Sequence, residues 1–218
     1  MRAQLALRRG RLDAGDAPLG WKLGFGSPGA RERLETSGPL SGFLVRSALV
    51  PSGGTVSVAG WTAPVAEPEV AVHLGRDLPP GAGRREAAAA IAGVGPALEL
   101  ADVDRPPDDV EAILAGNVYQ RAVVLGPVRA WPGGLRGLEA TVLRNGAEVA
   151  RTGDPEALTG DTLDLLVHLA GLLGAFGEAL GTGDVVITGS VVPPLAVEAP
   201  EELALRLARD LAAVGLAA

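Results

Sequence analysis

Short apolar segments, separated by frequent glycine and proline, limit the folds that this chain can adopt. The chain has 31 glycines and 17 prolines among 218 residues, and the longest uninterrupted pattern is one predicted helix. Strands are predicted at residues 65–74, 97–101, 122–125, 140–143, 148–150 and 185–188, and helices at 2–11, 30–35, 84–92, 108–114 and 162–180. A few helices among many strands favour an α+β fold with a curved antiparallel or mixed sheet over a regularly alternating doubly wound fold.

Two local signals fix the ends of predicted elements. Asn145-Gly146 stands between two apolar segments and is typical of the type I′ turn of a β-hairpin. Asp161 is a suitable N-cap for the helix at 162–180, and Gly181 is a suitable residue just beyond its end.

Composition excludes several classes of protein. The net charge of −7 leaves no basic surface for nucleic acid or an anionic membrane. The absence of cysteine excludes disulfides, thiolate metal sites and cysteine nucleophiles. Arginines interrupt the first apolar residues, so we see no signal peptide, and no apolar run reaches the roughly 18 residues of a membrane helix. We therefore expect a cytoplasmic protein with one catalytic domain over residues 1–218 and a short helical segment within residues 1–19.

Lys22 is the only lysine among 19 basic residues. Arginine does not release a proton near neutral pH, whereas a buried lysine can. A single lysine in an arginine-rich chain is therefore a candidate for proton transfer, although chance retention explains it equally well.

Glu67, Glu69 and Glu99 are candidate metal ligands. Glu67 and Glu69 lie two residues apart in a predicted strand, so their side chains share one face. Glu99 is the only polar residue of the apolar segment 96–101, where a carboxylate is either exposed or buried with a partner. Three glutamates without cysteine suit Mg²⁺ or Mn²⁺ better than Zn²⁺. The alternative is a set of solvated carboxylates.

Two further segments combine glycine with polar side chains. Thr188-Gly189-Ser190 closes a predicted strand, where glycine permits close approach of the backbone and the hydroxyls can bind a carboxylate. An ordinary strand end is the alternative. Asn117 follows Gly116 at the end of a predicted helix, where a C-cap is the simpler interpretation.

The order of these segments resembles the fumarylacetoacetate hydrolase superfamily, in its branch of 2-oxopent-4-enoate hydratases and 4-oxalocrotonate decarboxylases. The resemblance rests on GWKLGF at 20–25, PVAEPEVA at 64–71, PALEL at 96–100, AGN at 115–117 and GDVVITGS at 183–190. It covers nearly the whole chain from about residue 8 onward, and it includes the order and spacing of these segments.

The resemblance implies a fumarylacetoacetate hydrolase-like mixed β-sandwich roll with a few flanking helices. It implies Mg²⁺ or Mn²⁺ held by three glutamates, Lys22 as the acid/base residue and a small 2-oxo acid as substrate. The metal ligands would be Glu67, Glu69 and Glu99, and the substrate-binding residues would be Thr188, Gly189, Ser190 and Asn117. The implied activity is that of a metal-dependent lyase on a 2-hydroxy-dienoic or 2-oxo acid, through an enolate, in the catabolism of aromatic compounds. The implied assembly is a homo-oligomer, with a paired pathway enzyme as a further partner.

The chain departs from the pattern of this branch at four positions. Leu40 replaces the aspartate that hydratases often have, and Ser41 replaces an aromatic residue. Gly116 replaces an aspartate, and Tyr119 replaces a serine. These changes keep three alternatives open: a 2-oxo diacid decarboxylase, an acylpyruvate hydrolase, and a non-catalytic partner subunit. The hydrolase is disfavoured, because residues 26–38 contain no histidine and Glu99 stands where hydrolases usually have aspartate.

Overall fold

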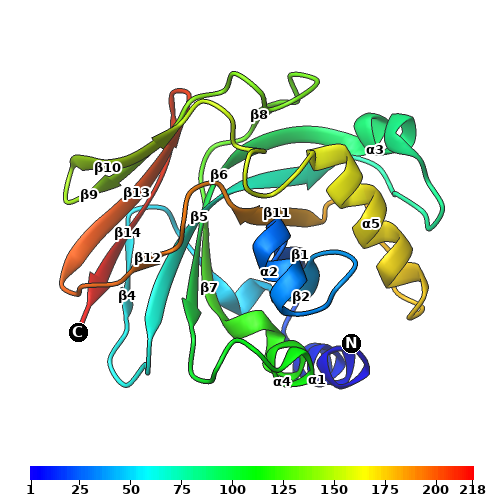
Figure 1. Cartoon of the computed structure of the whole chain (residues 1–218), viewed down its shortest axis with the longest axis horizontal. Helices are drawn as coiled ribbons and strands as arrows, with labels where there is room; N and C mark the ends of the chain where they lie inside the picture. Colours follow the sequence, from blue (N-terminus) through cyan, green and yellow to red (C-terminus); the bar gives the residue numbers. More distant parts are fainter.

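The computed structural model describes residues 1–218, which form two β-sheets with helices at one end (Figure 1). The larger sheet has nine strands. They are β1 (Pro18–Gly24), β2 (Leu40–Val45), β3 (Leu49–Val50), β5 (Pro64–Leu74), β6 (Ile91–Asp102), β7 (Gln120–Leu125), β8 (Arg129–Ala130), β11 (Val185–Ser190) and β12 (Leu195–Ala196). The main path is β2-β1-β11-β5-β6-β7-β3, and β12 and β8 pair with β5 and β6.

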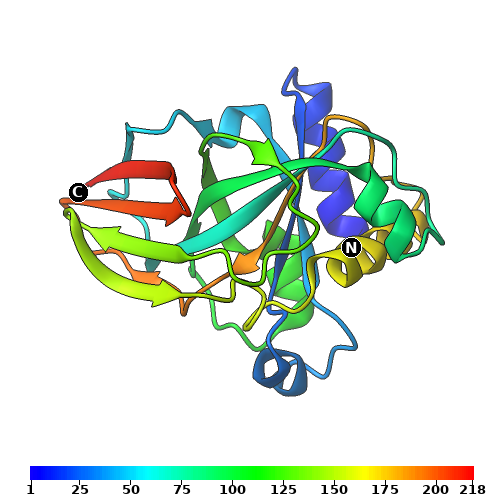
Figure 2. The same cartoon turned by 90° about the horizontal axis from the view of Figure 1, so that it is seen from above.

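The smaller sheet has five strands in the order β10-β9-β13-β14-β4. Their bounds are β4 (Gly54–Ser57), β9 (Ala140–Arg144), β10 (Ala147–Thr152), β13 (Glu201–Leu207) and β14 (Asp210–Ala217). This sheet packs against β5, β6 and β7 at the end that carries the C-terminus (Figures 1 and 2). One cluster of 38 buried apolar residues includes side chains from both sheets, such as Leu98 and Val214, so the two sheets share a core.

The helices flank the other end of the larger sheet (Figure 2). They are α1 (Arg2–Asp13), α2 (Pro28–Arg33), α3 (Arg84–Ala90), α4 (Val110–Ala115) and α5 (Thr162–Gly174), with 3₁₀ turns η1 (Arg46–Ala48) and η2 (Asn117–Tyr119). Mixed sheets with a few short helices confirm the predicted α+β class.

The central strands position the candidate site. β5 and β6 are antiparallel neighbours, and β11 runs antiparallel to β5 and parallel to β1. The register between β11 and β5 shifts between Ile187 and Ser190, where Gly189 has a φ of 98°. This irregularity turns the backbone of Gly189 towards β5, as the site geometry below shows.

The predicted helix at 162–180 is wrong at its C-terminal end. Asp161 caps the helix as expected, with its Oδ1 accepting from the N–H groups of Leu163 (2.9 Å) and Asp164 (3.2 Å). The helix ends at Gly174, because Gly177 adopts a φ of 77° and the N–H of Glu178 then bonds to the carbonyl of Leu173 at 3.0 Å. Glycine in the left-handed conformation is the usual helix terminator, so Gly177 plays the part that we expected of Gly181.

Other local predictions hold, with changed bounds. Asn145 and Gly146 both have positive φ, 51° and 78°, and join β9 to β10 as the hairpin signal predicts. The helix predicted at 84–92 ends at Ala90, because Ile91 begins β6. The sequence patterns did not predict β1, β2, β13 or β14, nor the short strands β3, β4, β8 and β12.

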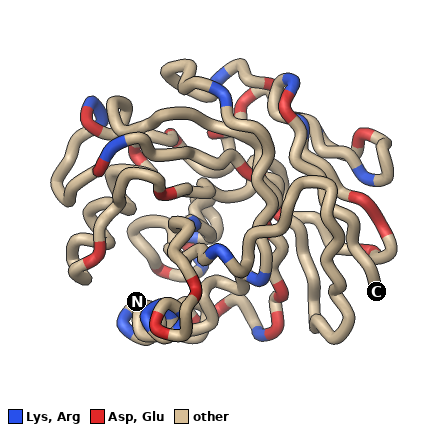
Figure 3. The backbone as a smooth tube through the Cα atoms, turned by 180° about the vertical axis from the view of Figure 1, so that it is seen from behind, with Lys and Arg blue, Asp and Glu red and all other residues tan.

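Basic and acidic residues are both spread along the chain, with several basic residues near the N-terminus (Figure 3). No helix combines the length and the apolar character that a membrane crossing requires.

Candidate active site

Three carboxylates meet on the face of the central sheet. Glu67 of β5 lies directly opposite Glu99 of β6, and Glu69 follows two residues later on the same face of β5. One oxygen from each of these three side chains lies within 4.8 Å of the others. The period of two along β5 predicted the first pair, and the β5–β6 register adds the third member.

The carboxylates of Glu69 and Glu99 are fully buried and only partly satisfied. Glu69 Oε2 accepts the N–H of Gly189 at 2.6 Å, whereas Glu69 Oε1 and Glu99 Oε2 have no hydrogen-bond partner. Burial, followed by the charges of Glu99 and Glu67, raises the pKa of Glu69 well above its usual value. Burial also raises the pKa of Glu99 to about 7.

These observations fit a divalent cation. Orphaned buried oxygens are rare and need an explanation, and hard cations such as Mg²⁺ and Mn²⁺ take carboxylate oxygens as ligands. The residues present would therefore hold such an ion through Glu67, Glu69 and Glu99.

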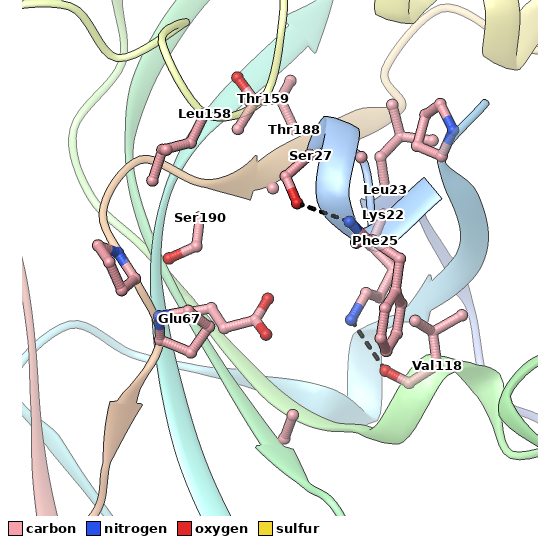
Figure 4. A pocket seen from close by; sticks show the side chains of 18 of the residues that line it. Lys22, Leu23, Phe25, Ser27, Glu67, Val118, Leu158, Thr159, Thr188 and Ser190 are labelled. Atoms are coloured by element: carbon pink, nitrogen blue, oxygen red, sulfur yellow. Dashed lines mark hydrogen bonds between the residues drawn. The ribbon is translucent and has the colours of Figure 1, made fainter. Parts of the chain in front are cut away.

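Lys22 lies beside this cluster, on β1, and is 2% exposed. Its ammonium donates to Glu99 Oε1 and to the carbonyl of Val118, the latter at 3.0 Å (Figure 4). Burial lowers the pKa of Lys22, but the charges of Glu99, Glu67 and Glu69 outweigh that effect and raise it above its usual value. The only lysine of the chain is therefore held as a cation next to the candidate metal ligands.

A strained segment presents the carbonyl of Val118 to Lys22. Asn117, Val118 and Tyr119 all have left-handed φ, at 56°, 53° and 63°, which is an outlier for a β-branched residue such as valine. The Tyr119 hydroxyl bonds to the carbonyls of Arg105 and Pro106, both at 3.2 Å. This contact anchors one end of the segment.

Asn117 anchors the other end, which corrects its expected role. Its amide accepts from the N–H of Phe43 at 2.8 Å and donates to the carbonyl of Phe43 at 2.9 Å. Asn117 is buried and does not line the cavity described below. The side chain is not a helix C-cap, because the cap position is Gly116. Both of its polar atoms bond to β2, and a contact of Asn117 with substrate stays a prediction.

The predicted Thr188-Gly189-Ser190 segment lies at the cavity. The hydroxyls of Thr188 and Ser190 donate to the carbonyls of Val70 (3.2 Å) and Pro68 (3.4 Å), and the N–H of Gly189 is engaged by Glu69. Each hydroxyl oxygen can still interact with a bound molecule. Binding of a substrate carboxylate by this segment stays a prediction.

A cavity of about 620 Å³ opens above the carboxylates. Its polar end carries Lys22, Glu67, Thr188 and Ser190, and Figure 4 shows the carboxylate of Glu67 directed into it. Its other walls are largely apolar and come from distant segments: Leu23, Phe25, Ala30, Val65, Ala101, Val103, Val118, Tyr119, Leu158, Leu165, Val192 and four prolines, Pro39, Pro107, Pro193 and Pro194. Such a cavity suits a small acid with an apolar body.

The site also includes residues that the sequence did not indicate. Val118 and Tyr119 act through backbone conformation, and Arg33 lines the cavity from α2; no sequence motif marks these roles. The two histidines lie outside the carboxylate cluster. The His168 ring packs against Gly38, and its Nε2 lies 3.3 Å from the carbonyl of Pro39.

Comparison with known proteins agrees with this geometry. The profile of the fumarylacetoacetate (FAA) hydrolase C-terminal family matches residues 29–214. A 2-hydroxyhexa-2,4-dienoate hydratase of Comamonas testosteroni is 30% identical over 195 residues, which cover 87% of this chain and 74% of that protein. A 4-oxalocrotonate decarboxylase of a Pseudomonas species is 28% identical over 190 residues, covering 86% of this chain and 73% of that protein.

A solved structure is similar over almost the whole chain. The 4-oxalocrotonate decarboxylase from Pseudomonas putida G7, complexed with magnesium and adipate, superposes with a TM-score of 0.88 at 26% identity. The match covers 98% of this chain and 83% of that chain. With its two-sheet fold, its three convergent glutamates and a family profile that spans most of its length, this chain belongs to the fumarylacetoacetate (FAA) hydrolase C-terminal family.

Proposed function

We propose that this chain is a divalent-metal-dependent lyase acting on a small 2-hydroxy-dienoic or 2-oxo acid. The observation that carries the proposal is the contact between Lys22 and Glu99 beside three clustered carboxylates at the polar end of an apolar cavity. Relatives named as hydratase and decarboxylase support the same class of chemistry.

The three glutamates would hold Mg²⁺ or Mn²⁺, in line with the magnesium in the related decarboxylase structure. When bound, the cation supplies Lewis-acid stabilisation of negative charge on a substrate oxygen. Glu99 and the Val118 carbonyl fix the ammonium of Lys22 at the wall, so that its proton is available to a substrate carbon or oxygen. Thr188 and Ser190 would orient the substrate carboxylate from the neighbouring wall.

The apolar walls have a separate task. They remove water from around the reacting atoms, which strengthens each charge interaction inside the cavity. Because the side chain of Lys22 is 2% exposed, bulk water does not compete with its ammonium as the proton donor. The ammonium is therefore positioned as the proton donor during ketonisation.

A 2-oxo diacid decarboxylase is the second candidate, and the environment of Leu40 favours it. Leu40 is buried in an apolar cluster with Leu34 and Ile113, so no carboxylate stands there to activate water. The titratable side chains on the cavity wall are Lys22, Arg33, Glu67 and Tyr119, and the Tyr119 hydroxyl is already bonded to two carbonyls. Loss of CO₂ needs no activated water, whereas hydration does.

The side chains that line the cavity also bear on the remaining alternatives. An acylpyruvate hydrolase also needs a base for water, and no histidine lines the cavity. A non-catalytic partner subunit would bind the cation without turning over any substrate. We further propose a cytoplasmic homo-oligomer in aromatic-compound catabolism, with a paired pathway enzyme as partner; size-exclusion chromatography with light scattering tests the oligomer.

The test is an ultraviolet assay of the purified protein with and without Mg²⁺ or Mn²⁺. Freshly generated 2-hydroxypenta-2,4-dienoate and 4-oxalocrotonate are supplied in parallel. Metal-dependent loss of the dienoate absorbance supports the hydratase, and loss of oxalocrotonate alone supports the decarboxylase. Bound metal without turnover of either compound supports the non-catalytic partner.

A further inference from the structure

Helix α1 buries an uncharged polar side chain that the proposed mechanism does not use. Gln4 is fully buried, and Leu5 is the only other buried residue of this helix. The Gln4 amide donates from Nε2 to the carbonyl of Ser41 at 2.7 Å, whereas its Oε1 has no hydrogen-bond partner. A buried oxygen without a partner costs stability, so stability alone does not explain why an amide is buried here.

Gln4 bonds to the outer edge of β2. This strand is the last one on its side of the larger sheet, so the backbone groups along its outer edge have no neighbouring strand. Two side-chain amides take the place of that strand. Gln4 binds the carbonyl of Ser41, and Asn117 binds both the N–H and the carbonyl of Phe43. The backbone of β2 is therefore held on both sides of Gly42, which lies between these two residues.

Gly42 lies directly against Lys22. The two residues are paired in the register between β1 and β2, and a Cβ at Gly42 would lie 2.7 Å from Cγ of Lys22 and 3.0 Å from its Cδ. Only glycine permits so close an approach of the backbone to the lysine side chain. A displacement of β2 at Gly42 therefore acts directly on the methylene chain that carries the ammonium.

The same helix also contacts β1, the strand of Lys22. The guanidinium of Arg8 lies 4.8 Å from the centre of the Trp21 ring and forms an ion pair of 3.1 Å with Glu178. Trp21 is buried and immediately precedes Lys22. Helix α1 thus holds both strands of the pair that carries the lysine, β1 through Trp21 and β2 through Ser41.

We propose that Gln4 is a positioning residue for Lys22, which acts through the backbone of β2 at Gly42. Its hydrogen bond keeps β2 against the lysine side chain, so that the ammonium reaches Glu99 and the carbonyl of Val118. Gln4 does not line the cavity, so its effect on the reaction passes through the lysine. The kinetic consequence rests on the proposed function, whereas the position of the lysine is measurable without turnover.

Two variants test the contact, and the same helix supplies the control. Gln4→Met and Gln4→Leu cannot donate a hydrogen bond, and both also remove the unpartnered Oε1, so their two effects on stability oppose each other. Leu5→Ala leaves a void in the main apolar core and keeps the bond from Gln4 to β2. Thermal unfolding of each variant establishes that it is folded at the assay temperature.

The first measurement is the accessibility of Lys22. Because this is the only lysine of the chain, formaldehyde with cyanoborohydride methylates Lys22 and the N-terminal amine alone, and mass spectrometry of peptides separates the two. Lys22 should be methylated several-fold faster in both Gln4 variants than in the wild type, because β2 no longer holds its side chain in place. Leu5→Ala should keep the wild-type rate.

The second measurement is steady-state kinetics with Mg²⁺ and whichever of the dienoate and oxalocrotonate the wild type turns over. Both Gln4 variants should lower kcat by about tenfold, since misplacement of a proton-transfer group slows the chemical step. Their KM should not change, because the cavity wall is intact. Leu5→Ala should keep both constants.

Equal methylation rates of Lys22 in the wild type and both Gln4 variants would overturn the positioning role. The same conclusion would follow if Leu5→Ala changed the methylation rate or kcat as much as the Gln4 variants do. Failure of the proposed function gives a different result: the wild type turns over neither compound, and the methylation rates still decide whether Gln4 positions Lys22.

Discussion

The backbone carbonyl of Val118 lies 3.0 Å from Nζ of Lys22. The carbonyl reaches this position because three consecutive residues adopt left-handed φ, a conformation that costs of order 1–3 kcal/mol for each non-glycine residue. The surrounding contacts must offset this strain, so the side chains that make them control the position of Lys22 from a distance.

Asn117→Ala should therefore lower kcat by about a hundredfold, because small misplacement of a catalytic group can have that effect. It also removes two buried hydrogen bonds to Phe43, at a cost of roughly 1–3 kcal/mol of stability. Steady-state kinetics and urea unfolding measure both effects.

The control for this variant is Asn145→Ala, in the β9–β10 hairpin, which removes one hydrogen bond to the N–H of Glu202. It should lose some stability and keep kcat. If Asn117→Ala keeps wild-type kcat, the carbonyl of Val118 does not position Lys22.

Binding of Mg²⁺ should weaken as the pH falls below about 7. Burial raises the pKa of Glu99 to about 7 in the metal-free chain, so below that pH a proton must leave before the cation binds. Displacement of one proton predicts roughly a tenfold loss of affinity per pH unit. Calorimetry between pH 5.5 and 8 measures it, and an affinity that stays constant over this range would rule out protonation of the cluster.

Acid should destabilise the protein through His73. Burial lowers the pKa of His73, and its Nε2 has no partner, so the folded chain favours the neutral ring. Because the unfolded chain binds the proton more readily, this contribution is fully present above the unfolded pKa of about 6.5 and is lost as the pH falls through the folded pKa. Thermal unfolding at pH 7.5 and 5.5 should show a smaller loss of Tm for His73→Gln than for the wild type; equal losses would show that His73 does not contribute.

Gly189→Ala should destabilise the chain, because φ is 98° at this residue and the new Cβ would lie 3.2 Å from Cγ2 of Thr159. The expected cost is about 1–3 kcal/mol, or a fall of roughly 2–12 °C in Tm. Gly10→Ala in α1 is the opposite control, since its Cβ would meet no atom within 4 Å and alanine favours a helix by roughly 0.5–1 kcal/mol. A Tm that does not fall in Gly189→Ala would contradict the strain argument.

Local patterns predicted the parts of the fold that depend on neighbours in sequence. Asn145-Gly146 specified its hairpin, and Asp161 its helix start, because both signals act over a few residues. Strand β1 was not predicted because its glycines interrupt the apolar pattern. Gly20 is nevertheless required in this strand, because a Cβ there would lie 1.9 Å from the carbonyl oxygen of Val185.

The candidate site was predicted in part, for the same reason. Glu67 and Glu69 share a face by strand periodicity, whereas Glu99 joins them only through the pairing of β5 with β6. Asn117 was assigned to substrate only through the family resemblance, and its position at a predicted helix end indicated a C-cap. Its contact with Phe43 joins segments 74 residues apart, which no local pattern specifies.

The most direct test distinguishes the role of Lys22 in turnover from the role of the three glutamates in metal binding. Mg²⁺ binding by calorimetry and metal-dependent turnover of the dienoate and of oxalocrotonate would be measured for the wild type, Lys22→Ala and Glu69→Gln. We expect Lys22→Ala to bind Mg²⁺ and to lose turnover by at least about a hundredfold, and Glu69→Gln to lose both. Turnover that survives in Lys22→Ala would contradict the assignment of Lys22 as the proton donor, and unchanged Mg²⁺ affinity in Glu69→Gln would contradict the metal site.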